Sequence, residues 1–268
     1  MKRNSLRYLV YLAAAITFST LGFLLLFILI KGIPHINLDF FSKIYTQVNA
    51  SVLPSLLTTL MVIAGALLIA TPIGIFTAIY LVEYANRKSG IVKVISVAID
   101  TLAAVPSIVY GLFGFLMFVT AMQFGFSLVA GILTTAIMIL PLIIRSTEEA
   151  LIAIDSSLRE ASYGLGAGKL RTIFNVVLPV AIPGILSGVI LAIGRIVGES
   201  AALIYTLGSA TIMPKSLGQS GRTMAVHMYM LAQEGLHVNQ AYATGVVLIV
   251  IVLILNYIST KVSQQLAK

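Results

Sequence analysis

The chain has 268 residues, of which 59% are hydrophobic and 10% are charged, and its formal net charge is +8. A soluble domain carries roughly 25% charged residues, so this composition excludes a water-soluble globule and predicts an integral membrane protein. Cysteine is absent and no two of the three histidines have metal-ligand spacing, which excludes disulfides and thiolate metal sites. In a membrane protein the positive charge reports sidedness, and we expect no nucleic-acid partner.

The first predicted element is an apolar run from Leu9 to Ile30, preceded by Lys2, Arg3 and Arg7. This pattern resembles a signal peptide, but the run is long enough to cross a bilayer, which takes about 20 residues. No small-residue cleavage motif follows it, so we interpret it as a retained first helix.

Five further apolar segments follow, at about Leu56 to Val82, Val94 to Met122, Phe126 to Ile144, Ile182 to Leu207 and Ala241 to Ile258. A membrane β-barrel would need alternating strands of roughly ten residues. These runs are continuous, and a helix satisfies its own backbone in lipid. The predicted fold class is therefore an all-α integral membrane protein with six transmembrane helices. We expect one membrane domain over 1–268, with its core at about 51–260.

The lysines and arginines predict the orientation. With the N-terminus inside, twelve of them are cytoplasmic, at 2, 3, 7, 87, 88, 93, 145, 159, 169, 171, 261 and 268, and four are outside, at 31, 43, 215 and 222. This excess fits the positive-inside rule. We therefore expect a multi-pass protein of the plasma membrane with both termini in the cytoplasm. The loop at about 145–180 then faces the cytoplasm, and the segment at about 208–240 faces outward.

The stretch EASYGLGAGKLR, residues 160–171, is one of the few strongly polar parts of the chain and looks like a phosphate-binding loop. A P-loop requires G-x-x-x-x-G-K-[ST] between a strand and a helix. Tyr163 stands where the first glycine should be, and Leu170 stands where the Ser or Thr should be. Two interpretations remain: a flexible cytoplasmic loop, or two short amphipathic helices joined by a turn that the glycines permit.

The continuation EASYGLGAGKLRTIFNVVLP resembles the E-A-A-x3-G-x9-I-x-L-P signature of ABC importer permeases. The matching residues are Glu160, Ala161, Gly166, Leu178 and Pro179, with Ser162 and Val176 as conservative replacements. The resemblance implies the type I ABC importer permease fold. It makes Glu160 to Gly168, Gly164 included, a cytoplasmic coupling helix that docks on an ATPase subunit. It also implies that this chain is not an enzyme and binds no cofactor, because the partner ATPase holds ATP and Mg.

Four segments look like the PstA-type permease of phosphate-specific ABC importers: TPIGIFTAIYLVEYA from Thr71, VPSIVYGLFG from Val105, GRIVGESAALIYTLG from Gly194 and HMYMLAQEG from His227. The resemblance implies half of a phosphate path. The implied partners are a second permease of the same fold (PstC-type), an ABC ATPase dimer (PstB-type) and an extracytoplasmic phosphate-binding protein (PstS-type). One alternative is a permease for another oxyanion, such as sulfate or molybdate. Another is an ion-coupled secondary transporter using Asp100 and Glu199, which leaves the signature unexplained.

Arg195 and Glu199 lie four residues apart in the fifth predicted span, and hence on one helix face. Charges within a span are costly and usually face the bundle interior or a water-filled path. A guanidinium suits a tetrahedral oxyanion. We hypothesise that Arg195 lines the translocation path, oriented by Glu199; the alternative is a purely structural ion pair.

The third predicted span contains Asp100 and, after it, Pro106, Ser107 and Gly111. Pro106 and Gly111 could break the helix and expose backbone groups that line the path. Asp100 is expected to be an interfacial carboxylate paired with Lys93 or with a neighbouring helix. Arg145 and Glu148 are expected at a solvated helix end. In the outer segment, Arg222 and Lys215 could meet an anion or a binding protein, or could be ordinary loop charges, and the histidines receive no role.

Overall fold

The computed structural model describes residues 2–86 and 89–266, so Arg87, Lys88 and Lys268 of the charge count lie outside the described residues. Within them every regular element is helical. The α-helices are α1 (Lys2–Gly32), α2 (Leu53–Ile79), α3 (Gly90–Ala104), α4 (Ser107–Gly114), α5 (Leu128–Ile152), α6 (Ser156–Gly164), α7 (Lys169–Thr172), α8 (Leu178–Val197), α9 (Ala201–Thr206), α10 (Met224–Glu234) and α11 (Val238–Leu266). Two 3-10 turns, η1 (Ile33–His35) and η2 (Asp39–Phe41), and three π-helical segments, η3 (Tyr80–Tyr84), η4 (Phe115–Ala121) and η5 (Ile173–Val177), complete the order.

In the described part of the chain, five helices are long and apolar enough to span a membrane: Arg7–His35, Leu53–Tyr84, Leu128–Ile152, Lys169–Val197 and Val238–Lys261. The pair Gly90–Ala104 and Ser107–Ala121 makes a sixth if it is counted as one span, although it bends by 102°. The predicted all-α fold with six apolar spans is confirmed in this form. The third predicted span is bent at Pro106, where a break was predicted, and the fifth was wrong in detail, because it ends at Val197, before the separate helix α9.

The core of the molecule lies where α2, α5 and α8 pack together, with α11 beside α8. Its largest cluster of buried side chains includes Val62, Met138, Ile139, Ile143 and Ile196. A Cβ on Gly188 of α8 would collide with the Ser146 side chain of α5, so only glycine permits this close approach. These helices therefore form a fixed frame for the segments at either end.

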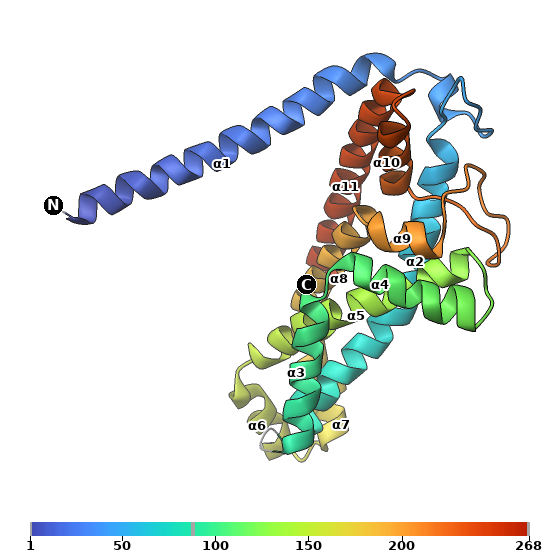
Figure 1. The fold of residues 1–268 in the computed structure, drawn as a ribbon. Coiled ribbons are helices and arrows are strands. Elements are labelled where there is room, and N and C mark those ends of the chain that lie inside the picture. Colours follow the sequence, from blue (N-terminus) through green and yellow to red (C-terminus); the bar gives the residue numbers. More distant parts are fainter. Residues whose placement is uncertain (1, 87–88, 267–268) are drawn as a thin grey trace.

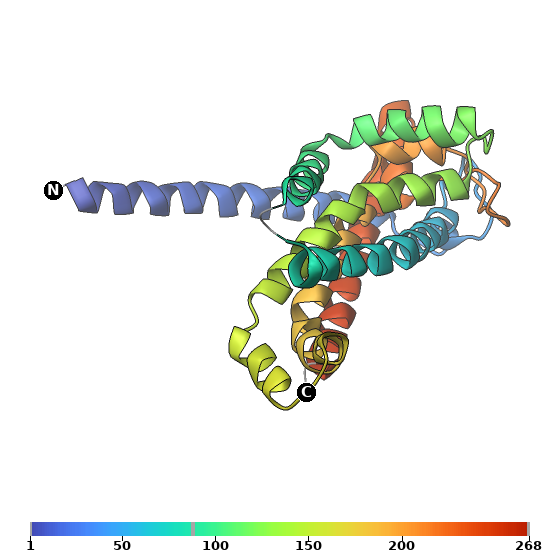
Figure 2. The ribbon, with the colours of Figure 1, turned by 90° about the horizontal axis from the view of Figure 1, so that it is seen from below.

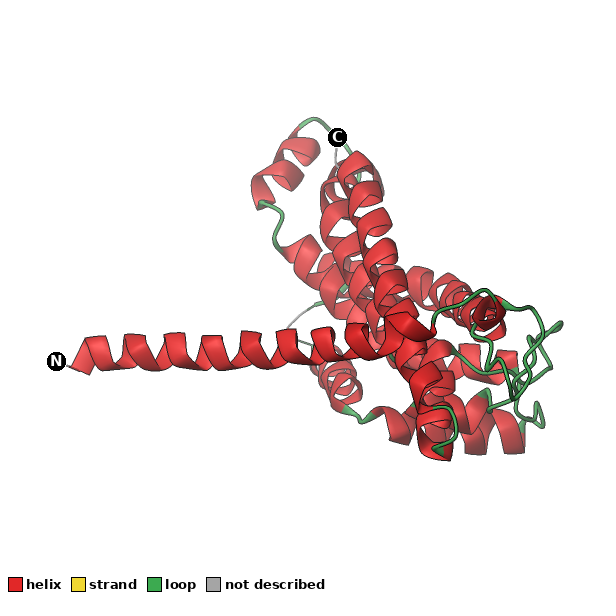
Figure 3. Ribbon diagram, turned by 90° about the horizontal axis from the view of Figure 1, so that it is seen from above, coloured by secondary structure: helices red, strands yellow, loops and turns green. Residues whose placement is uncertain are grey.

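Helix α1 leaves this bundle as a single long helix, as all three views show (Figure 1, Figure 2 and Figure 3). None of the residues in its most apolar stretch is buried against the rest of the chain. Its end is fixed to α11, where the rings of Phe27 and Tyr242 meet edge to face at 5.7 Å. The exposed apolar surface of α1 is therefore available to lipid or to another subunit.

The bundle has two contrasting ends (Figure 1). One, the α6–α7 end, consists of residues 153–177 and the parts of α2, α3 and α5 next to them. The other, the α10 end, consists of residues 33–52 and 208–237. Figure 1 shows α6 and α7 at the bottom of the bundle, and α10 and the 33–52 segment at the top.

Candidate functional site

The signature stretch folds as two short helices joined by a turn. Asp155 caps α6 by accepting a hydrogen bond of 2.8 Å from the Ser157 backbone N–H, and this bond holds the pKa of the Asp155 carboxyl below its usual value. Gly166 has φ +82, a conformation that glycine adopts without strain. Gly168 then begins α7. The helix–turn–helix interpretation is thus confirmed over the flexible loop, but the first helix is Ser156–Gly164 rather than Glu160 to Gly168.

The outer surface of this turn is apolar and exposed. Leu165 is 90% exposed and Leu170 is 64% exposed. Of the signature residues, Ser162 and Leu178 are half-buried, while the exposed ones are Glu160, Ala161, Gly164, Gly166 and Pro179. Leu178 and Pro179 open α8, directly after the π-helical η5. Apolar side chains in this position are suited to a groove on another protein.

The base of the turn is attached to the bundle by polar contacts. Arg159 of α6 forms an ion pair of 2.8 Å with Glu83 in η3, and it also donates to the backbone oxygens of Leu151 and Ile154. The side chains of Arg159 and Glu83 are 17% and 6% exposed. Because 76 residues separate them, no local spacing could reveal the pair. The ion pair fixes α6 to the end of α2.

Two further contacts hold α7. The hydroxyls of Ser162 and Thr172 lie 2.8 Å apart and join α6 to α7. The Lys169 ammonium lies 4.6 Å from the centre of the Tyr84 ring in η3, a distance at which a cation is attracted to the ring face. The turn is therefore a braced element.

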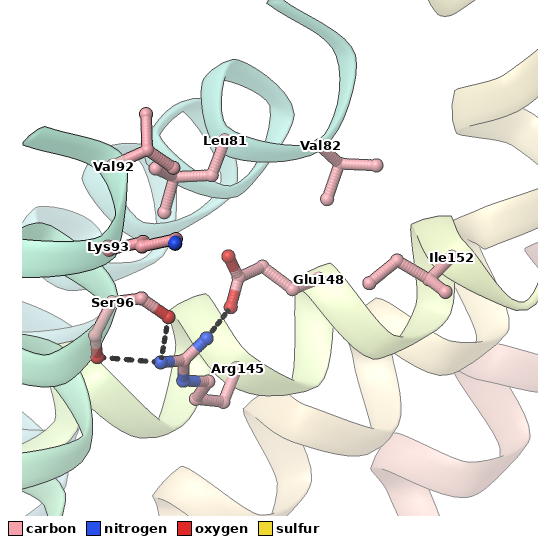
Figure 4. Close-up of a pocket in the computed structure, with 8 residues that line it drawn as sticks. All are labelled: Leu81, Val82, Val92, Lys93, Ser96, Arg145, Glu148 and Ile152. Atoms are coloured by element: carbon pink, nitrogen blue, oxygen red, sulfur yellow. Dashed lines mark hydrogen bonds and ion pairs between the residues drawn. The ribbon is translucent and has the colours of Figure 1, made fainter. Parts of the chain in front are cut away.

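Arg145 of α5 forms a second network, next to a cavity of about 280 Å³ (Figure 4). Its Nε donates to Asp100 at 2.7 Å and its Nη1 to Glu148 at 2.5 Å. Its Nη2 donates to the backbone oxygen and the hydroxyl of Ser96 in α3, at 2.7 and 2.8 Å. In Figure 4 the Lys93 side chain also points into the cavity. One guanidinium thus joins α3 to α5.

This network corrects one expectation and confirms another. Arg145 and Glu148 are not at a solvated helix end, because α5 continues to Ile152 and Glu148 is buried. The continuation was missed because Arg145 and the polar residues after it look like the start of a loop. Asp100 is paired with a neighbouring helix, as expected, through Arg145 rather than Lys93. In the described part of the chain, no group of three or more His, Asp or Glu side chains could hold a metal ion.

The structure separates Arg195 from Glu199. Helix α8 ends at Val197, and the buried Glu199 carboxylate accepts a hydrogen bond of 2.9 Å from the Ala202 backbone N–H, which caps α9. No ion pair joins Glu199 to Arg195 among the described residues, so the expected orientation of Arg195 by Glu199 was wrong. Arg195 is half-buried, and its charge lies within electrostatic range of the Tyr110 hydroxyl in α4.

The predicted break at Pro106 is present and well defined. α3 ends at Ala104 and α4 starts at Ser107, and the Tyr110 hydroxyl bridges the break by donating to the Leu102 backbone oxygen at 2.8 Å. Gly111 does not break the helix. A Cβ there would lie 2.8 Å from the Ala202 Cα, so Gly111 is a close-packing position between α4 and α9. The α3–α4 bend and the α8–α9 break thus face each other, with Arg195 and Glu199 nearby.

Comparison with known proteins identifies the family to which this architecture belongs. The model of the binding-protein-dependent transport system inner membrane component family matches residues 70–268. Probable ABC transporter permease protein YqgI of Bacillus subtilis is 32% identical over 91% of this chain and 89% of its own length. Phosphate transport system permease protein PstA of Yersinia pestis is 36% identical over 85% of this chain and 79% of its own.

Among solved structures, a chain of the bacterial alginate ABC transporter in complex with alginate pentasaccharide-bound periplasmic protein superimposes with a TM-score of 0.74. The superposition covers 100% of this chain and 96% of the other, at 17% identity, and therefore shows the fold alone. The predicted type I ABC importer permease fold is confirmed. The chain belongs to the family of binding-protein-dependent transport system inner membrane components.

Proposed function

We propose that this chain is the membrane-spanning permease subunit of an ATP-driven phosphate importer. It forms half of the path beside a second permease of the same fold, and a phosphate-binding protein delivers the substrate. A separate ATPase dimer hydrolyses ATP, and the chain itself catalyses nothing and binds no cofactor. It lies in the plasma membrane with both termini in the cytoplasm. The observation that carries the proposal is the braced α6–α7 turn, with an exposed apolar surface at the position of the importer signature.

The turn has the properties that mechanical coupling requires. Leu165 and Leu170 give it an apolar surface that a cleft on the ATPase can bury. Arg159 and Glu83 connect it to α2, so movement of the ATPase displaces α2 together with α6. A flexible loop in this place would absorb the displacement, and a braced one transmits it to the core helices.

A single-cysteine crosslink tests the docking, because the chain has no cysteine of its own. Ala161→Cys is expected to crosslink to the ATPase chain in the assembled complex. Gly218→Cys, which is exposed at the α10 end, is the matched control and should give no such product. If Ala161→Cys formed no crosslink in a complex that still contains the ATPase, the docking proposal would fail.

Phosphate as the substrate is supported by the name of the Yersinia pestis relative and by Arg195. Arg195 is half-buried and has no carboxylate partner among the described residues, so its fork of N–H groups is available to an oxyanion. Since a fully compensated anion would be trapped, one half-exposed arginine gives weak binding of the kind that conduction needs.

Uptake by the assembled complex tests this assignment. Arg195→Gln is expected to abolish ATP-dependent phosphate uptake while the complex still assembles, and Lys31→Gln, another cation outside the break region, should leave uptake intact. Unchanged uptake in Arg195→Gln would refute the role of Arg195. Uptake that sulfate or molybdate suppresses as well as unlabelled phosphate does would instead indicate a permease for another oxyanion.

A further inference from the structure

The α10 end holds a buried positive charge without a counter-charge. Arg222 lies in the segment before α10 and is only 3% exposed. None of the ion pairs found among the described residues includes it. Its Nε and Nη2 have no hydrogen-bond partner among the described residues, and the centre of the Tyr45 ring lies 4.7 Å from its guanidinium carbon. An isolated buried charge is among the most costly features that a fold can contain, so it requires an explanation.

The unsatisfied atoms of Arg222 form one edge of its guanidinium. The Nε–H and an Nη2–H bond point in nearly the same direction, as a fork that matches two oxygens of a carboxylate or phosphate. If two backbone carbonyl oxygens accepted these N–H groups, the edge would not be free to bind a second group. The free edge therefore has the geometry to bind an oxyanion.

The residues around Arg222 supply no negative charge. His227 is fully buried, its ring meets Tyr45 edge to face at 6.1 Å, and neither ring nitrogen has a hydrogen-bond partner. Burial lowers the pKa of His227 to about 3, with the Arg222 charge acting in the same direction, so the ring is neutral at pH 7. The nearby backbone of Ala50 acts to raise the pKa of His227, but its contact with the ring does not have the geometry of a hydrogen bond. The buried hydroxyl of Thr223 is also unpartnered.

A cavity of about 480 Å³ is lined in part by the same Tyr45 side chain. Two exposed cations, Lys43 and Lys215, line it together with Tyr45, and the rest of its wall is apolar, from the first turns of α2 and from Ile212 and Met213. No carboxylate is among the lining residues. Tyr45 thus lines a cavity with two ammonium groups and also contacts the buried guanidinium of Arg222.

We infer that this cavity and Arg222 together form a second oxyanion site, for a phosphate-type group, with Tyr45 as the side chain that moves aside to admit it. Lys43 and Lys215 attract the anion, and the free edge of Arg222 binds two of its oxygens. The site is separate from Arg195, and the inference stands whether or not Arg195 contacts the transported substrate. The group can come from free inorganic phosphate or from the headgroup of a lipid that fills the apolar wall.

Charge and access favour a phosphate group over a carboxylate of a docked protein. Three cations surround the site, and a dianionic phosphate offsets more of this charge than a single carboxylate does. Arg222 is covered, so a side chain on a folded partner would have to pass the whole cavity and displace Tyr45 to reach it. A small oxyanion, or a headgroup on a flexible chain, can do so.

The test uses the full chain, assembled with the second permease and the ATPase dimer but without the phosphate-binding protein, and purified in a maltoside detergent, which contains no phosphate. Titration with inorganic phosphate is expected to show saturable binding in the wild type, in Lys31→Gln and in Arg195→Gln. Arg222→Gln should weaken this binding about tenfold or more, because hydrogen bonds to charged groups are among the strongest polar contacts. The Arg195→Gln arm keeps the failure of this site distinct from the failure of the proposed substrate path.

A second variant keeps the inference testable if Arg222→Gln does not fold. Lys43→Gln combined with Lys215→Gln changes only exposed side chains and should weaken binding several-fold. If inorganic phosphate does not bind, titration with phosphatidic acid follows, and binding that both variants lose supports the site with a lipid source. Phosphate and phosphatidic acid binding that is absent, or that is unchanged in both variants, overturns the inference. So does a result in which Arg222→Gln only weakens co-purification of a partner, because that outcome identifies a protein carboxylate.

Discussion

The two ends of the molecule treat buried arginines in opposite ways. At the α6–α7 end, Arg159 and Arg145 each have a carboxylate within 3 Å and further oxygen acceptors around them. At the α10 end, Arg222 is more deeply buried, and among the described residues it has no carboxylate partner and no acceptor for its Nε and Nη2. The first arrangement joins helices of the same chain, and the second leaves a charge for something outside the chain. A guanidinium whose N–H groups have acceptors within the chain holds helices together. A guanidinium that is buried without such acceptors is available to bind a ligand.

The energetics explain why this difference is informative. Removing a charge from water is costly, and an ion pair with good hydrogen bonding recovers most of that cost. An isolated charge recovers little of it, and a ring at 4.7 Å contributes only about 0.5 to 2 kcal/mol. Substitutions that remove the partner of a buried arginine at the α6–α7 end are therefore expected to lower the free energy of unfolding. Removal of the unpaired Arg222 charge at the α10 end is expected to raise it.

The largest expected effect is at the Arg159–Glu83 pair. Glu83→Gln leaves the Arg159 charge buried without its counter-charge and should lower the free energy of unfolding by about 3 kcal/mol. Thermal unfolding of the purified chain in detergent measures this. Changing both residues to Met should recover most of the loss, since an apolar pair carries no desolvation cost. A Glu83→Gln protein as stable as the wild type would show that the pair does not brace α6.

Within the Arg145 network, the more buried carboxylate should matter more. The side chain of Glu148 is 11% exposed and that of Asp100 is 64% exposed. Glu148→Gln is expected to cost about 2 kcal/mol, and Asp100→Asn less than about 1 kcal/mol, because solvent screens the exposed pair. The same unfolding assay applies to both variants. Equal losses would contradict the ranking by burial.

The α10 end should be sensitive to acid through His227. In the unfolded chain the ring takes up a proton near its ordinary pKa of 6.5, whereas in the folded chain it does so only near pH 3. Between these values the unfolded state binds more protons, so stability falls as the pH falls. From pH 7.5 to 5.5, the wild type should lose about 1 kcal/mol more than His227→Gln. Parallel pH profiles of the two proteins would refute the low pKa.

The last effect has the opposite sign to the first. In phosphate-free detergent, Arg222→Met removes an unpaired buried charge and should raise the free energy of unfolding by about 1 kcal/mol after the loss of the Tyr45 contact. The matched substitution Arg159→Met should instead destabilise the chain. If Arg222→Met were as harmful as Arg159→Met, Arg222 would have a partner within the chain and the contrast between the ends would disappear.

Much of the fold follows from local pattern, and much of the site does not. The bend at Pro106 was predictable because proline removes a backbone donor and disfavours helix at the preceding residue. The break between α8 and α9 was not, because it depends on the Glu199 carboxylate capping α9, and Glu199 equally suits an uninterrupted span with Arg195 one turn earlier. Hydropathy reports the apolarity of such a segment but not the direction of its backbone.

The sequence by itself determined that this is a helical membrane protein, where its apolar segments lie, and that 160–179 carries the importer signature, because these properties depend on composition and on short spacings along the chain. Only the tertiary structure decided that Arg159 pairs with Glu83, that Arg145 pairs with Asp100, and that Arg222 has no carboxylate partner among the described residues. These outcomes depend on which helix ends meet. A charge has the same letter in the sequence whether it is solvated, paired or buried alone, and its free energy is set by the groups that the fold brings to it.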